Sequence, residues 1–220
     1  MMILYGLLFG LWPCAYLLLQ DYTFFSEKQI RNYISLGHSI SCSIFSGCSL
    51  LCNEPSLLQS FIVYLSTSYF IWDTFYILLK QKRTESLYLY HHCICLLLVM
   101  DIYYKRNSYL FTSALFIGEF SNIWNYVIYD MIQRKVSQGF IVPMKILQVC
   151  WFCYLRVYWL TYLNYYYFHE LVGYFIPYSI LSIYGLGILW GCKQFYSTIF
   201  DIKNYYYPSI QHHPQLIKTE

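Results

Sequence analysis

Two adjacent histidines, His91 and His92, lie near the start of an apolar run that extends from Tyr88 to Tyr104. An imidazole acts as a general acid or base near neutral pH, and in a narrow, dry cavity it can relay a proton or accept a transferred group. Adjacent residues on an α-helix point about 100° apart. We therefore expect one histidine to point fully inward, while the other braces it or faces a neighbouring helix.

Ionisable and amide side chains also interrupt four other apolar runs of the chain. A charged group costs roughly 2.5–3.5 kcal/mol at the membrane centre on insertion scales, so such groups should face the interior of a bundle or a wet cavity. In a bundle of about seven transmembrane helices, these side chains all fall in the central and cytosolic half of the membrane. These candidate lining residues are His38, Asp73, Glu119, Asn122, Asn125 and Arg156.

The composition indicates a membrane protein made of helices. Of the 220 residues, 58% are hydrophobic and 11% are charged, whereas a soluble domain has roughly 25% charged residues. A helix needs about 20 mostly apolar residues to cross a bilayer. We predict an all-α, polytopic membrane helical bundle of about seven transmembrane helices, one N-terminal helix followed by six. The apolar runs are 2–19, 34–52, 57–79, 88–104, 108–132, 141–163 and 171–199.

The segments between these runs are predicted to be loops. They include a polar segment at 20–33, a tight turn at 53–55, a basic loop at 80–86 and an aromatic turn at 164–170. Pro177 lies early in the last run and is expected to kink that helix.

Basic residues collect on one side of this topology. Ten Lys or Arg residues lie in the odd-numbered loops and at the C-terminal end, against two, Lys105 and Arg106, in the other loops. Cytoplasmic loops collect Lys and Arg. We therefore expect a lumenal or external N-terminus and a cytosolic tail at 204–220.

A purely structural interpretation of the polar residues stays open. Interhelical bonds, for example from Arg156 to Glu119 or Asp73, would hold the bundle together without any chemistry. Helical spacing places Asp73 on one face with Tyr69, Tyr76 and Lys80, and Arg156 on one face with Gln148, Phe152 and Trp159.

Five motifs occur in an order that resembles the TLC-domain family, which includes translocation-associated membrane proteins and ceramide synthases. They are His38-Ser39, the segment STSYFIWD ending at Asp73, the pair His91-His92, GEFSNIWNY at 118–126, and Arg156 in an aromatic span. The resemblance covers residues 26–203. It implies a six-helix TLC domain preceded by an extra N-terminal helix at 1–25.

In ceramide synthases, the histidine pair and nearby acidic residues serve acyl transfer from acyl-CoA to a sphingoid amine. The resemblance thus implies that His91 and His92 are catalytic candidates, that Asp73 orients them, and that acyl-CoA is the co-substrate. The fifth run differs, because it carries Glu119 and two asparagines in place of a pair of aspartates. In this respect the chain resembles the small TLC-domain-only proteins, whose roles concern membrane lipid composition or cargo handling in the secretory pathway.

Other patterns are weaker. Cys150 and Cys153 form a CxxC inside an apolar run rather than at a strand-to-helix turn, and the nine cysteines are expected to be buried thiols. No HxxxH or similar spacing occurs, so no metal or other cofactor is predicted. GxxxG patterns at 6–10 and 187–191 would let helices approach closely, which leaves a homo- or hetero-oligomer open.

We predict a multi-pass TLC-domain membrane protein that binds or handles lipids and affects membrane lipid composition, in the endoplasmic reticulum or another internal membrane. The alternative is an acyl-CoA-dependent N-acyltransferase of ceramide-synthase type that uses the histidine pair; whether the chain is an enzyme stays open. A channel, transporter or receptor is disfavoured, because the extracytosolic half has few ionisable residues beyond Asp101 and Glu170. The net charge of +3 is too small to indicate nucleic acid, so membrane lipids are the expected partners.

Overall fold

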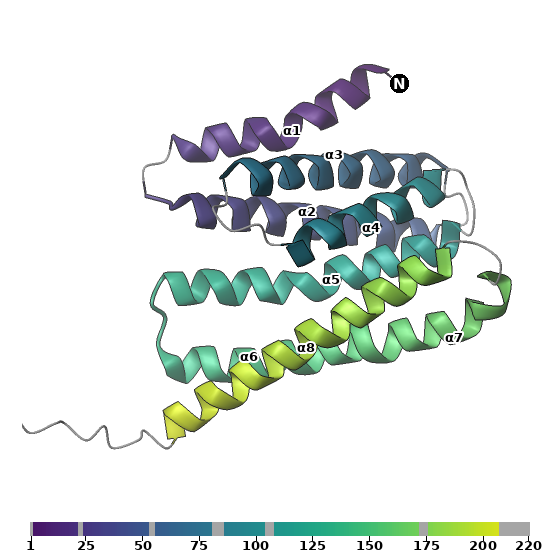
Figure 1. Cartoon of the computed structure of the whole chain (residues 1–220). Helices are drawn as coiled ribbons and strands as arrows, with labels where there is room; N and C mark the ends of the chain where they lie inside the picture. Colours follow the sequence, from purple (N-terminus) through teal and green to yellow (C-terminus); the bar gives the residue numbers. More distant parts are fainter. Residues whose placement is uncertain are drawn as a thin grey trace, which may run out of the picture.

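The computed structural model describes residues 2–21, 24–52, 56–80, 86–103, 108–171 and 176–206. In this part of the chain every regular element is helical, which confirms the all-α prediction, and the helices form seven continuous segments (Figure 1). The segments are α1 (Met2–Gln20), α2 (Glu27–Leu51), α3 (Ser56–Lys80), α4 (Ser86–Tyr103), α5 (Ser108–Gln133), the unbroken run of α6 (Gln138–Phe152), η1 (Cys153–Trp159) and α7 (Leu160–Leu171), and α8 (Ile176–Tyr206).

Three of these segments are long and apolar enough to cross a membrane, among the residues that the structure describes. They are Glu27–Leu51, Leu57–Lys80 and Gln138–Tyr167. Leu8–Gln20 and Ser86–Met100 are shorter apolar helices. The length and apolar character of these helices indicate a helical membrane protein.

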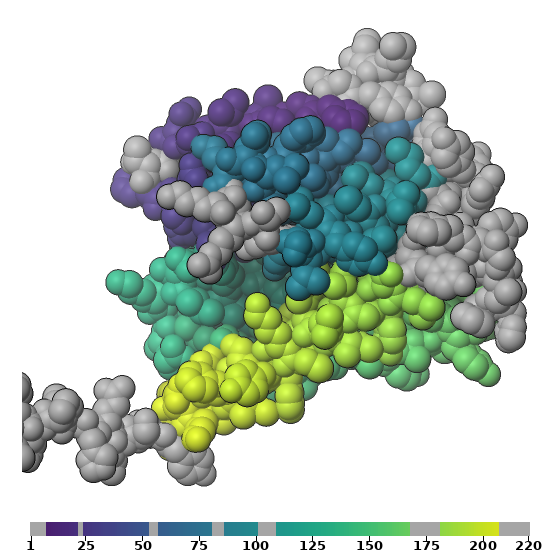
Figure 2. Space-filling view, in the orientation of Figure 1, coloured from purple at the N-terminus to yellow at the C-terminus, as the bar shows by residue number. Residues whose placement is uncertain are grey.

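Helix α2 lies in the middle of the bundle. It packs most extensively against α5 and also against α3, while α1 lies on the outside against α3 and α2 (Figure 1). On the other side of α5, the run from α6 to α7 packs against α8. Helices α4 and α8 meet on one face of the molecule (Figure 2). As a result, a common space is enclosed by four parts of the bundle, namely α4, α5, η1 with α7, and α8.

Helix α2 begins seven residues earlier than predicted, so the expected loop at 20–33 is wrong in its second half. Ser26 caps the helix: its hydroxyl accepts a hydrogen bond from the Gln29 backbone N–H at 3.3 Å, and the Gln29 side chain accepts one from the Ser26 backbone N–H at 2.9 Å. This reciprocal capping box starts a helix even where the first turns are polar. The early start places Arg31 on the helix.

The predicted aromatic turn at 164–170 and the kink at Pro177 are also wrong. Residues 160–171 contain no Gly or Pro, and α7 continues through them to Leu171. Pro177 is the second residue of α8, in the first turn, where its missing N–H needs no partner. The predicted turn at 53–55, most of the basic loop, Gly173 and the tail from residue 207 lie outside the described residues.

The end of α5 is closed by a Schellman motif. The Val136 N–H donates to the Met131 carbonyl and the Lys135 N–H donates to the Ile132 carbonyl, both at 3.0 Å. Lys135 has a φ of 55°, a left-handed conformation that usually belongs to glycine at this position. A strained lysine therefore stands at the turn between α5 and α6.

The η1 segment changes the face that its helix presents. The Leu160 N–H bonds to the Leu155 carbonyl, five residues earlier, so the helix is locally wider than an α-helix. Phe152 and Arg156 are buried as the spacing predicted, but Trp159 is 37% exposed and Leu160 takes its place inside. A π-helical turn of this kind is frequent at functional sites.

Candidate functional site

A cavity of about 40 Å³ lies among α4, α5, η1 with α7, and α8. His91, Glu119 and Arg156 line one part of it, and apolar side chains, including Val99 and Phe111, line the rest. His91 is near the start of α4 and Glu119 is near the middle of α5. The two helices run antiparallel (Figure 1), and both residues line the same part of the cavity. From His91 to Val99 the axis of α4 advances about 12 Å. The cavity thus has a polar end and an apolar end.

Arg156 is the largest fully buried side chain at this site, with 2% of its surface exposed. Its Nε donates to the Ser121 hydroxyl at 2.8 Å, and its Nη2 donates to the Gly118 carbonyl at 2.8 Å and to Asn122 Oδ1 at 3.1 Å. Arg156 therefore ties η1 to α5 through neutral acceptors. The structural interpretation had offered Glu119 and Asp73 as partners of Arg156. These two carboxylates instead accept hydrogen bonds from Ser39 and Arg31.

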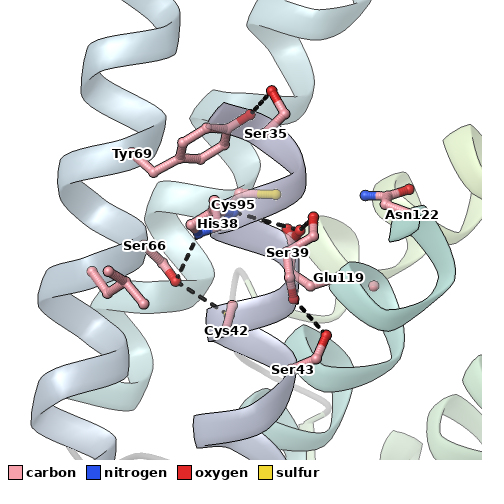
Figure 3. Close-up of polar contacts among 12 residues, drawn as sticks. Ser35, His38, Ser39, Cys42, Ser43, Ser66, Tyr69, Cys95, Glu119 and Asn122 are labelled. Atoms are coloured by element: carbon pink, nitrogen blue, oxygen red, sulfur yellow. Dashed lines mark hydrogen bonds and ion pairs between the residues drawn. The ribbon is translucent and has the colours of Figure 1, made fainter. Parts of the chain in front are cut away.

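Glu119 is held at the cavity wall by groups from α2 (Figure 3). The Ser39 hydroxyl donates to Glu119 Oε2 at 2.5 Å, and His38 Nδ1 lies 3.5 Å from the same oxygen, an electrostatic contact rather than a hydrogen bond. His38 Nε2 lies 3.3 Å from the Ser66 hydroxyl, and the Tyr69 ring stacks on the imidazole at 3.9 Å. His38 is fully buried behind Glu119 and does not line the cavity.

Asp73 forms a second polar cluster, between α2, α3 and α4. Its two oxygens accept hydrogen bonds from Arg31 Nε at 2.7 Å and from Arg31 Nη2 at 2.9 Å. His92 Nε2 lies 3.4 Å from the same carboxylate, and its Nδ1 lies 3.2 Å from the Thr74 hydroxyl. His92 therefore faces α3, and Asp73 orients this histidine rather than His91.

His91 faces the cavity. The ring packs edge-on against Trp190 of α8, with the ring centres 5.1 Å apart, and Cys95 Sγ lies 3.5 Å from Nε2. The two adjacent rings thus turn toward different helices, as their positions on a helix require. Of the pair, His91 is the one that can meet a bound molecule.

The family model of the TLC domain matches residues 2–200. The chain belongs to the TLC-domain family. This confirms the resemblance seen in the motifs, and the matched stretch includes α1, which the motifs left ahead of the domain. Neither the curated proteins nor the solved structures contain a match.

The asparagines of α5 bind other polar side chains of the TLC domain. Asn125 Oδ1 accepts a hydrogen bond from Gln194 Nε2 at 3.1 Å and another from Gln148 Nε2, and Asn125 Nδ2 lies 3.5 Å from Asn122 Oδ1. These bonds join α5, α6 and α8, and neither asparagine lines the cavity. For these two residues the structural interpretation is sufficient.

Three of the predicted site residues therefore meet in the cavity of the TLC domain, namely His91, Glu119 and Arg156. The other five, His38, Asp73, His92, Asn122 and Asn125, lie in polar clusters behind its wall. Among the described residues, no group of three or more His, Cys, Asp or Glu is placed to hold a metal ion.

Two residues at these sites were not predicted from the sequence. Cys95 lines the cavity, and Arg31 binds Asp73. A helical signal existed for both, because Cys95 follows His91 by four residues and Arg31 precedes His38 by seven. Within the bundle itself, the buried cysteines are Cys42 and Cys95. The remaining cysteines are exposed at the surface of the bundle, except Cys153, which is half-buried.

Proposed function

We propose that this TLC-domain protein binds a lipid in its central cavity and thereby affects the lipid composition of the membrane. The observation that carries the proposal is the two-ended cavity, with His91, Glu119 and Arg156 at one end and buried apolar side chains along the other. A polar head group would meet the guanidinium and the imidazole. The acyl chain would extend toward Val99 and Phe111. Because the cavity measures only about 40 Å³, against roughly 300–1,000 Å³ for pockets that enclose a ligand, the side chains around it would have to move apart to admit the chain.

The proposal includes a multi-pass arrangement in which all seven helical segments cross the membrane, with the N-terminus lumenal and the C-terminus cytosolic. The ends of α2, α3 and α5 that carry Lys28, Lys80 and Arg134 lie at the same end of the bundle (Figure 1). An internal membrane, such as the endoplasmic reticulum, is the proposed location. A glycosylation site that is accepted at the N-terminus and refused at the C-terminus would support this orientation.

The cavity proposal is tested by filling the apolar end. Ala114 lines the cavity, so Ala114→Phe should lower the amount of lipid that co-purifies with the protein, measured by native mass spectrometry after mild detergent extraction. Leu97→Phe is the matched control, because Leu97 is 45% exposed on the outer face of α4. Equal lipid in both variants and in the wild type would count against the cavity as the binding site.

An acyl-CoA-dependent N-acyltransferase activity is the second candidate function. The observation that favours it is the position of His91, which faces the cavity at the end that Glu119 and Arg156 also line. Transfer of a labelled acyl group to lipid amines by the wild type, lost in the His91→Ala/His92→Ala double variant, would establish it. Absence of product together with retained lipid in both proteins would leave lipid binding alone.

Association through small residues is proposed for α1 rather than for α8. A side chain at Gly187 or Gly191 would meet Arg156 or Phe152 of the same chain within 3.5 Å, whereas nothing lies within 4 Å of a side chain at Gly10. Gly10→Leu should therefore shift an oligomer toward the monomer in detergent if α1 forms the contact. An unchanged oligomeric state would place the contact elsewhere.

A further inference from the structure

Cys95 differs from the other cysteines in what surrounds it. It is 7% exposed, lines the cavity and follows His91 by one helical turn, with its Sγ 3.5 Å from Nε2 and 3.7 Å from Nδ1. Cys42, the other buried cysteine, contacts Ser66 at 3.5 Å behind the wall. Cys95 therefore combines a cavity position with a neighbouring imidazole.

We propose that Cys95 accepts an acyl group from a long-chain acyl thioester, such as acyl-CoA, that enters the cavity. The sulfur attacks the carbonyl carbon, His91 takes the thiol proton, and the carbon–sulfur bond to coenzyme A breaks. The proton then passes from His91 to the departing thiolate, which leaves as free coenzyme A. One thioester is exchanged for another, so the step needs no oxidant or reductant.

The geometry supplies each part of this step. A thiol beside an imidazole is the pairing that activates a cysteine nucleophile. The Sγ atom lies 3.5 Å from Nε2 and 3.7 Å from Nδ1 of His91. The proton transfer therefore requires the imidazole to rotate until one nitrogen points at the thiol. Arg156 brings a positive charge to the end of the cavity that Glu119 also lines, and its guanidinium would stabilise the negative charge that develops on the carbonyl oxygen.

The position of Cys95 along α4 also suits an attached chain. Leu98 and Val99 lie one turn further along the same helix and line the apolar end. A chain bound to Cys95 would therefore extend into the region that the proposed function assigns to a lipid tail, and the inference rests on that proposed function. A lipid amine or hydroxyl that attacked the new thioester would regenerate the thiol.

The test uses the full-length protein in lipid nanodiscs, incubated with palmitoyl-CoA and examined by intact mass and peptide mapping. We expect one acyl adduct, on Cys95, that neutral hydroxylamine removes. Cys95→Ala should abolish it, while Cys93→Ala should leave it unchanged, because Cys93 is exposed on the same helix. His91→Gln should slow adduct formation roughly 100-fold, as for loss of a general base.

Adducts that form equally on Cys93 and Cys95, or that persist in Cys95→Ala, would overturn the inference. Co-purified lipid is measured in the same preparations. The results for lipid binding and for acylation of Cys95 can therefore be told apart. Retained lipid without a Cys95 adduct would refute S-acylation and leave lipid binding intact. No retained lipid and no adduct would refute both. Cys95→Ser is the fold control, since a hydroxyl of similar size should preserve bound lipid.

Discussion

Replacing Asp73 by Asn should destabilise the bundle measurably. Asp73 accepts two hydrogen bonds from Arg31, at 2.7 and 2.9 Å, and lies 3.4 Å from His92. Asparagine keeps one acceptor oxygen but loses the charge. Removing one partner of a buried ion pair costs about 3–5 kcal/mol of stability. This range is the upper limit for the destabilisation by Asp73→Asn.

Two features reduce that figure. The Arg31 side chain is 16% exposed, and its guanidinium lies over the rings of Tyr76 and Tyr88, at 5.6 and 5.9 Å, so it keeps part of its stabilisation. Polar contacts between membrane helices are also weaker than their geometry suggests, about 0.6 kcal/mol on average. We expect Asp73→Asn to lower the free energy of unfolding by about 2 kcal/mol, or roughly 30-fold in the unfolding equilibrium.

Fluorescence-detected size-exclusion chromatography after heating in detergent measures this effect. A loss of 2 kcal/mol corresponds to a fall of about 4–8 °C in the melting midpoint for a chain of this size. Lys80→Met is the control, because the Lys80–Glu27 contact of 3.4 Å joins two half-exposed side chains and is worth at most about 1 kcal/mol. Equal shifts in the two variants would refute the assignment of Asp73 to a buried structural cluster.

Three further substitutions test other parts of the structure by the same assay. Gly187→Leu should displace the Arg156 side chain, whose Cδ would lie 3.5 Å from the new Cβ, and cost about 1–3 kcal/mol; an unchanged midpoint would mean that α8 does not pack closely on η1. Lys135→Gly should raise stability by about 1 kcal/mol by relieving the left-handed lysine at φ 55°, and a lower midpoint would contradict the Schellman assignment. Ser26→Ala should cost about 1 kcal/mol through loss of the cap on α2, whereas Ser26→Asp should be nearly neutral; equal losses in both would argue against the capping box.

The sequence predicted the helices better than the partners of their polar residues. Long apolar runs and the cost of charge in lipid were enough to predict each of the described helical segments and the inward-facing positions of Asp73, Glu119 and Arg156, but not where α2 begins or where α7 ends. Which groups they meet depends on the rotation of each helix relative to its neighbours, and apolar periodicity leaves that rotation loosely defined. Arg156 therefore meets Ser121 rather than a carboxylate.

Two local features account for most of the remaining differences. The capping box at Ser26 extends α2 through polar turns that hydropathy assigns to a loop, and it is this extension that brings Arg31 to Asp73. The π-helical turn of η1 shifts the buried face by one residue, so that Leu160 replaces Trp159 inside. Spacing rules based on 3.6 residues per turn cannot anticipate such an insertion.

Among the described candidate site residues, more contact neighbouring helices than line the cavity. The bonds of Asn125, Asp73 and His92 are made to neighbouring helices. His91 and Cys95 instead face the cavity and each other. Any activity of the domain should therefore depend more on His91 than on His92, and separate His91→Ala and His92→Ala variants would distinguish the two.

The position of a bound acyl chain distinguishes lipid in the cavity from lipid on the outer surface of the bundle. A palmitoyl lipid with a diazirine near the end of its chain, activated by light in nanodiscs and mapped by peptide mass spectrometry, reports which side chains surround the tail. If the chain occupies the cavity, we expect adducts on the cavity residues Val99, Phe111 and Leu160. Adducts confined to outward-facing residues such as Leu97 and Tyr154 would contradict it.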